Sequence, residues 1–199
     1  MQGRDDRFQS EWQSLAYHLH KTVVLVGMMG CGKTAIGTEL SRQLNVLFLD
    51  SDAEIEAAAN ATIAEIFARN GENFFRQKEA QVLARLLTGA PCVLSTGGGA
   101  FLRESNRASI GRDGVSVWLD APVELLWQRV RHKTTRPLLM TGNPRRTLGE
   151  IFAARTPLYA MAELRVPTRP NYSISEMTDA VLEALRGRPD IVTDLETNA

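Results

Sequence analysis

The sequence predicts an α/β fold in three α/β/α layers, with a five-stranded parallel sheet covered by helices on both faces. Five short apolar runs, each the length of a buried strand, alternate with longer segments whose apolar residues recur every third or fourth position. A glycine-rich segment joins the first strand to the first helix, an arrangement found in such folds. The 199 residues suffice for one domain with a sizeable core.

The strands and helices follow each other in a regular order along the chain. The first helix carries Ile36, Leu40 and Leu44 on one face. The strands are expected at residues 21–26, 46–49, 92–95, 115–119 and 164–166. The remaining helices are expected at residues 53–59, 62–67, 72–88, 103–113, 122–131, from about 148 onward, and 175–186.

Local signals place several helix ends. Thr62 followed three residues later by Glu65 is a capping box, and Gly71 after Asn70 stops that helix. Pro122 suits the first turn of the helix that follows the fourth strand. Pro157 should bend the helix that resumes near residue 148.

The composition is that of a soluble globular protein. The 23 basic and 23 acidic residues balance, so no global positive field attracts nucleic acid or an anionic membrane. No apolar run approaches the length of a membrane span, and residues 1–20 do not resemble a secretory signal. Cys31 and Cys92 lack metal-ligand spacing, which favours reduced thiols and a cytoplasmic location.

Both ends of the chain are expected to lie outside the folded unit. Residues 1–20 are interpreted as a short helical or frayed extension, and residues 187–199 as a weakly ordered tail. The domain between them is expected to span residues 21–186.

Residues 27–34 read GMMGCGKT and match the phosphate-binding loop G-x-x-x-x-G-K-[ST]. Its glycines let the backbone amides approach phosphate oxygens, Lys33 reaches the terminal phosphates, and the Thr34 hydroxyl ligates Mg²⁺. Cys31 lies among these amides at a helix start. It is interpreted as a small filler side chain, the alternative being a thiol of lowered pKa that nucleotide shields from alkylation.

Two carboxylates follow the second strand. Asp50 and Asp52 are two residues apart, so on an extended backbone they point to one site beyond the strand's C-terminal end. Capping of helix 53–59 is the alternative, and it accounts for only one of the two. The spacing therefore favours a polar site.

Two further features have structural as well as functional readings. Arg76 and Glu79 are three residues apart on a helix, so the carboxylate can steady the guanidinium, although exposed pairs of this kind are common and weak. Gly97, Gly98 and Gly99 allow a ligand or another backbone to come close, but a flexible turn would explain them equally.

A basic segment follows the fourth strand. Prolines and a glycine interrupt it, which predicts a mobile loop whose arginines close on polyphosphate as a lid. A solvated charge run is the alternative, and His132 is expected to be solvated. The charged residues are Arg129, Arg131, His132, Lys133, Arg136, Arg145 and Arg146.

These features together resemble the shikimate kinase family, part of the nucleoside-monophosphate-kinase-like group. The resemblance covers about residues 20–185. The matching segments, in order, are residues 27–34, residues 49–52, Gly71-Glu-Asn-Phe-Phe-Arg76 with Glu79, residues 97–99, and Arg136-Pro-Leu-Leu139 with Arg155-Thr-Pro-Leu-Tyr159.

The resemblance implies a P-loop kinase fold, a mobile lid at about 132–147, and a substrate-binding region at about 53–80. It implies ATP and Mg²⁺ as cofactors and shikimate as substrate, which would become shikimate 3-phosphate; a monomer is expected. Lys33, Asp52 and Arg136 would be catalytic, and Thr34 and Asp50 would hold the metal. Nucleotide contacts would come from Gly30, Cys31, Gly32, Lys33, Thr34, Ala35, Arg129, Arg136 and Arg169. Substrate contacts would come from Asp52, Arg76, Gly97, Gly98, Gly99 and Arg155.

Three other functions compete with this one. A gluconate kinase of the same fold would also phosphorylate a hydroxy acid, but the segments 74–76 and 136–139 favour shikimate. A non-catalytic nucleotide-binding module would be expected to lack Lys33, Asp52 or the lid arginine, and all are present. A nucleic-acid-dependent ATPase would need an acidic end on the third strand and a basic face, and the sequence has neither.

Overall fold

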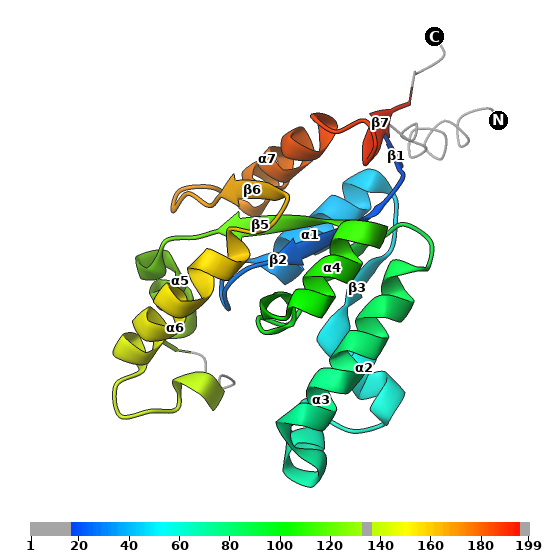
Figure 1. Cartoon of the computed structure of the whole chain (residues 1–199). Coiled ribbons are helices and arrows are strands. Elements are labelled where there is room, and N and C mark those ends of the chain that lie inside the picture. The colour runs from blue at the N-terminus through cyan, green and yellow to red at the C-terminus, as the bar shows by residue number, and fades with distance from the viewer. Residues whose placement is uncertain (1–16, 133–136, 196–199) are drawn as a thin grey trace, which may run out of the picture.

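The computed structural model describes residues 17–132 and 137–195. Five strands form the central sheet, and each hydrogen-bonded pair in it is parallel. The α/β fold and the five-stranded parallel sheet are therefore confirmed (Figure 1). In spatial order the strands are β3 (Phe48–Asp50), β4 (Val93–Ser95), β2 (Thr22–Val26), β5 (Gly114–Asp120) and β6 (Leu164–Pro167).

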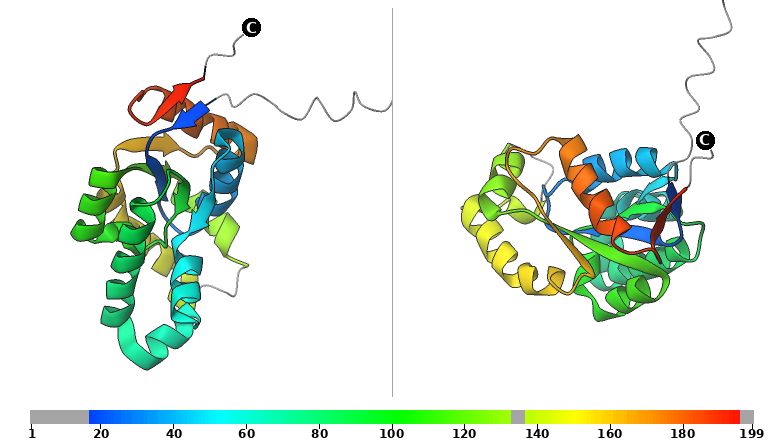
Figure 2. Two further views of the ribbon diagram at one scale, coloured as in Figure 1. Left: turned by 90° about the vertical axis from the view of Figure 1, so that its right-hand side faces the viewer. Right: turned by 90° about the horizontal axis from the view of Figure 1, so that it is seen from above.

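Helices cover both faces of this sheet (Figure 2). On one face α1 (Lys33–Leu44) packs against α7 (Ile174–Arg186), and on the other α3 (Ile63–Leu87) packs against α4 (Glu104–Asp113). These are the three predicted layers. The other helical segments are α2 (Ser51–Ala59), α5 (Val123–Val130), α6 (Pro144–Tyr159) and the 3₁₀ turns Ala100–Leu102 and Pro137–Leu139.

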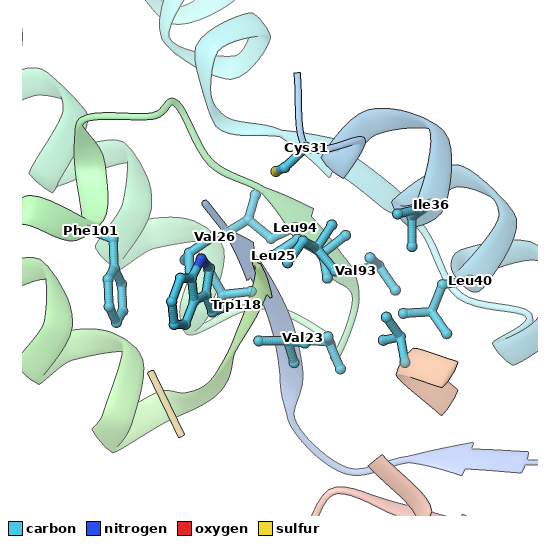
Figure 3. Packing of buried hydrophobic residues seen from close by; sticks show 14 of the residues in the cluster. Val23, Leu25, Val26, Cys31, Ile36, Leu40, Val93, Leu94, Phe101 and Trp118 are labelled. Atoms are coloured by element: carbon cyan, nitrogen blue, oxygen red, sulfur yellow. The ribbon is translucent and has the colours of Figure 1, made fainter. Parts of the chain in front are cut away.

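The core is centred on β2, where all five residues are buried between β4 and β5. Figure 3 shows Leu25 and Val26 among Leu94 and Trp118, with Ile36 of α1 to one side. A strand held on both edges and both faces is rigid. The loop that leaves its C-terminal end therefore starts from a fixed point.

The predicted second strand is an edge strand, which corrects its interpretation as buried. Residues 48–50 pair with β4 alone, all three are only partly buried, and Leu47 is 70% exposed. An apolar run of four residues does not reveal whether the strand has one neighbour or two.

The ends of the chain pair with each other. β1 (Tyr17–Leu19) lies antiparallel to β7 (Val192–Asp194), and both Ile191 and Val192 are buried. The expectation of a frayed extension up to residue 20 and a weakly ordered tail from residue 187 is therefore wrong for residues 17–20 and 187–195. Residues 1–16 and 196–199 lie outside the described part of the chain.

Helix ends agree with the sequence in some places and differ in others. The capping box at Thr62 is present, and Gly71, with φ of 78° and ψ of 175°, interrupts α3 where a stop was predicted. Pro122 is the N-cap of α5 and not a residue of its first turn. Asn143 caps α6, which begins four residues earlier than expected, so the predicted basic loop ends in a helical turn.

Candidate active site

The glycine loop after β2 has a shape that side chains would prevent. Gly30 has φ of +84°, and a Cβ there would lie 2.7 Å from Cγ1 of Val130. Gly27 and Gly32 also have positive φ values, of 137° and 106°. The loop leads directly into α1, so the first amides of that helix face the same space and favour an anion there.

Lys33 lies at the start of α1 and folds back over this loop. Its Nζ donates to the carbonyl oxygens of Gly27 at 2.9 Å and Met28 at 3.3 Å. Lys33 and Thr34 open on a cavity of about 290 Å³. The same cavity is lined by Met29, Gly30, Gly32, Ala35, Asp50, Asp52, Ser95, Thr96, Gly97 and Gly98. The tertiary structure thus joins three segments that are far apart in sequence.

Asp50 is the N-cap of α2, which was the alternative interpretation of this residue from the sequence. Its Oδ1 accepts from the backbone N–H groups of Asp52, at 2.9 Å, and Ala53, at 3.4 Å. Asp52 lies in the first turn of α2, not on an extended strand, so the spacing argument that paired the two side chains is wrong. They share one cavity because α2 starts directly at the end of β3.

The surroundings of Asp52 raise its pKa to about 6. Burial is the main cause, and the negative charges of Asp50 and Glu79 add to it, while Lys33 opposes them. Asp52 is therefore an ionised carboxylate at neutral pH but one that binds a proton readily. This is the behaviour that a general base needs.

Arg76 and Glu79 form a pair in which Glu79 is buried and Arg76 is partly buried, so the pair is not an exposed surface contact. Nη1 of Arg76 donates to both carboxylate oxygens of Glu79, whose side chain is 1% exposed, and Arg76 also contacts Glu72 at 3.3 Å. Burial raises the pKa of Glu79, with Arg76 opposing the rise. The pair directs the guanidinium at Gly99, where a Cβ would lie 2.7 Å from Nη1.

The three consecutive glycines after β4 each face a different charged side chain. A Cβ at Gly97 would lie 2.5 Å from Oδ1 of Asp52, and the carbonyl oxygen of Gly98 accepts from Nη1 of Arg155 at 3.2 Å. With Arg76 at Gly99, the structure brings the predicted carboxylate and both predicted arginines to one short loop.

Two residues that hold this loop were not selected from the sequence. The Gly97 N–H donates to Oγ of Ser51, and the Tyr159 hydroxyl donates to the Gly98 carbonyl. Tyr159 is buried, which raises its pKa to about 12, so it remains a donor. Ser51 stands between the two aspartates and Tyr159 follows Arg155 by one turn. This closeness in sequence to predicted site residues is the signal that could have identified Ser51 and Tyr159.

A second hollow, of about 370 Å³, shares Gly30, Gly32 and Ala35 of the glycine loop and helix α1 with the first cavity. Arg129 lines it and donates from Nη1 to the carbonyls of Gly30 and Cys31. Its other walls are Gly32, Ala35, Ile36, Tyr172, Ser173, Ile174 and Met177. Sequence reasoning missed Ile36 and the last four. Ile36 and Met177 matched core-facing helix positions, and residues 172–174 lay between the predicted loop 168–171 and the predicted helix 175–186.

Neither cavity is lined by the predicted residues Cys31, Arg76, Gly99, Arg155 or Arg169, although Arg76, Gly99 and Arg155 meet at the glycine loop beside the first one. Arg169 does not line either one, but its guanidinium lies 5.4 Å from the ring of Tyr172, which does. Cys31 is fully buried against the core (Figure 3), which supports a filler role, and its Sγ accepts from Lys33 Nζ at 3.8 Å inside the loop. Arg136 lies in residues 133–136, outside the described part of the chain.

The described residues contain no group of three or more His, Cys, Asp or Glu side chains that could hold a metal ion. Thr34 and Asp50 nevertheless line one cavity. Two protein oxygens suit Mg²⁺, which keeps several waters and is carried by substrate phosphates. None of the described helices has the length and apolarity to cross a membrane.

Comparison with known proteins identifies the family of this chain. The family model for shikimate kinase matches residues 29–186. A shikimate kinase from Cereibacter sphaeroides is 63% identical over 174 residues, covering 87% of this chain and 87% of the relative. A shikimate kinase from Paramagnetospirillum magneticum is 43% identical over 98% of this chain and 96% of its own length.

Solved structures place the chain in the same family. Shikimate kinase from Acinetobacter baumannii in complex with shikimate has a TM-score of 0.76 and 39% identity, covering 82% of this chain and 91% of its own. A gluconokinase from Sinorhizobium meliloti has a TM-score of 0.57 and 15% identity over 84% and 92% of the two chains, which is a likeness of fold alone. The chain belongs to the shikimate kinase family.

Proposed function

We propose that this chain holds the phosphates of ATP on the glycine loop 27–34 and holds shikimate over Gly97–Gly99, with Asp52 between them as the base. Its family makes the reaction the ATP-dependent phosphorylation of shikimate, a step of aromatic amino acid (chorismate) biosynthesis, giving shikimate 3-phosphate and ADP. One observation carries the assignment of residues. Asp52 lies in the cavity of Lys33 and also contacts the loop that Arg76 and Arg155 contact.

The two arginines suit the carboxylate of shikimate. A guanidinium pairs with a carboxylate through two parallel N–H donors, which a lysine cannot supply. Arg76 comes from α3 and faces Gly99, and Arg155 comes from α6 and faces Gly98. A small hydroxy acid held by both arginines would present its hydroxyl groups to Asp52.

Asp52 is suited to take the proton of the attacking hydroxyl. As the new O–P bond forms, the hydroxyl proton moves to the carboxylate, and the bond from the γ-phosphorus to the bridging oxygen breaks to release ADP. A pKa of about 6 leaves the carboxylate ionised at neutral pH and basic enough to accept that proton.

Charge on the transferred group would be neutralised from several sides. Lys33 and the first amides of α1 act from the glycine loop, and Arg136 would add a guanidinium from the lid. Thr34 and Asp50 would hold Mg²⁺, directly and through water. When bound, Mg²⁺ supplies a Lewis acid that draws charge from the phosphate oxygens.

The hollow beside Arg129 fits the adenine base. Ile36, Ile174 and Met177 give it apolar walls, and Arg129 can stack on a planar ring. Arg169 would act on this site through Tyr172. The hollow and the phosphate cavity share Gly30 and Gly32, so one nucleotide can occupy both.

The oligomeric state and location remain predictions. We expect a cytoplasmic monomer without nucleic-acid or membrane partners, because the charges balance and the sequence offers no membrane span. Light scattering on the purified protein should give the mass of one chain, and a dimer mass would contradict the prediction.

The deciding experiment is a coupled ADP-release assay with ATP, Mg²⁺ and shikimate. Shikimate should support turnover and gluconate should not, since a likeness of fold is all that favours gluconate. Lys33→Ala should abolish turnover while circular dichroism shows an intact fold. Release of ADP with gluconate but not with shikimate would overturn the proposed substrate.

A further inference from the structure

A separate cavity of about 340 Å³ lies between α2 and α3. The two helices run side by side away from the sheet (Figures 1 and 2). Phe74, Lys78 and Val82 of α3 line the cavity and are four residues apart, so they share one face of the helix. Arg76 and Glu79 lie on a different face, toward Gly99. The cavity is therefore distinct from the substrate site.

The hollow exists because small residues and a helix break leave it unfilled. Ala58, Ala59 and Ala61 form the α2 side, and Ile55 and Ile66 are buried at its base. Gly71 interrupts α3 directly after Arg69 and Asn70, which line the cavity. Its volume falls within the range of roughly 300–1,000 Å³ that is common for small-molecule sites.

The rim carries positive charge. Of the lining residues, all of which the structure describes, Arg69 and Lys78 are basic and none is acidic. Lys78 Nζ lies 5.5 Å from the Phe74 ring, at the apolar wall. Arg69 Nη2 is 3.6 Å from Oε1 of Glu65, whose Oε2 accepts from Thr62. That contact leaves Arg69 donors to spare.

Two amides, Asn70 and Gln81, also line the cavity, and Gln81 Oε1 accepts from Lys78 Nζ at 3.1 Å. An apolar interior with two cations and two amides in its lining is complementary to an amphipathic anion. We propose that the cavity between α2 and α3 is a second ligand site, for a small molecule with an apolar body and one carboxylate group. The body would contact Ile55, Ile66 and Phe74, and the carboxylate would lie between Arg69 and Lys78. The occupant would touch both helices that carry Asp52 and Arg76.

Calorimetric titration of the full chain with 2-naphthylacetate tests this site without any dependence on turnover. We expect a dissociation constant on the order of 0.1–1 mM, as suits a ligand of this size. The neutral analogue 2-(2-naphthyl)ethanol should bind about tenfold more weakly, because it cannot pair with the two cations. No binding of the acid at 5 mM would overturn the proposal.

Variants locate the bound probe. Ala59→Phe fills the cavity and should abolish binding, whereas Ala57→Phe, an exposed position on α2 outside the cavity, should leave it unchanged. Arg69→Gln should weaken binding about threefold, and adding Lys78→Gln should bring the loss to about tenfold. Arg42→Gln is a matched control, because Arg42 is also 68% exposed and also pairs with a glutamate on its own helix.

Competition with the substrates is the test that could contradict the proposal. Binding of 2-naphthylacetate should persist at saturating shikimate and at saturating ATP. Complete displacement by either one would put the probe in the substrate or nucleotide cavity and overturn the proposal. Equal weakening by Arg69→Gln and Arg42→Gln would do the same, and this comparison decides the matter even if Ala59→Phe fails to fold.

Discussion

Glu79 holds Arg76 by both carboxylate oxygens, at 3.1 and 3.0 Å from a single guanidinium nitrogen, although its own side chain is almost inaccessible to water. A buried carboxylate is stable only with such a partner. The pair fixes Arg76 beside Gly99, whereas the second contact of Arg76, to Glu72, lies at the surface. The orientation of the Arg76 guanidinium therefore depends on Glu79, its buried partner.

Glu79→Gln should raise the KM for shikimate about tenfold and leave the KM for ATP within about twofold, because the neutral amide no longer fixes the guanidinium by charge. Steady-state kinetics with each substrate varied in turn measures both values. Glu72→Gln is the matched control and should change neither by more than about twofold, since exposed ion pairs contribute little. A larger effect from Glu72→Gln would contradict the assignment.

Gly97→Ala should lower kcat on the order of tenfold to a hundredfold, because its Cβ would meet the Asp52 carboxylate and displace it from the reacting hydroxyl. The KM for ATP should change little. Gly111→Ala, within α4, is the control, because a Cβ there meets nothing within 4 Å. A normal kcat for Gly97→Ala would mean that the position of Asp52 is not critical.

Asp52→Asn should lower kcat on the order of a hundredfold or more if Asp52 is the base, while nucleotide still binds. In the wild type, kcat/KM should fall as the pH drops through about 6, where the carboxylate takes up a proton. The variant should lose this acid limb. Rate measurements from pH 5 to 9 test both statements, and a near-normal rate would leave Asp52 only an orienting role.

The same substitution should stabilise the protein at neutral pH. The fold raises the pKa of Asp52 from 3.8 to about 6, so it favours the protonated form and loses stability as the pH rises between these values. Above pH 6 the loss is complete, and it amounts to at most about 3 kcal/mol.

Asp52→Asn should therefore raise Tm at pH 7.5 by several degrees, about 3–8 °C, and the gain should vanish near pH 4. Thermal unfolding followed by circular dichroism at both pH values measures it. Asp179→Asn, at an exposed position of α7, should shift Tm by less than about 2 °C. A gain that is equal at both pH values would show that the charge is not its cause.

Arg155→Lys should raise the KM for shikimate about tenfold, because lysine lacks the paired donors for a carboxylate and also loses the contact with the Gly98 carbonyl. Tyr159 still donates to that carbonyl, so the loop should keep its shape. Kinetics at saturating ATP gives the value. An unchanged KM would remove Arg155 from the substrate pocket.

The sequence alone determined the features that depend on near neighbours. The phosphate loop, the capping box at Thr62 and the stop at Gly71 are patterns within a few residues, and each was found where it was predicted. The alternation of apolar runs with helices predicted the parallel sheet, because strands that face helices on both sides need continuous apolar character.

Only the tertiary structure decided which distant segments meet. Gly97, Gly98 and Gly99 each face a charged side chain from a different helix, and no spacing along the chain encodes that match. The pairing of β1 with β7 likewise joins two segments that are close in space and far apart in sequence. The sequence left open whether Glu79 is an exposed or a buried partner of Arg76. Packing decides this, because the burial of a side chain depends on the neighbours that it acquires on folding.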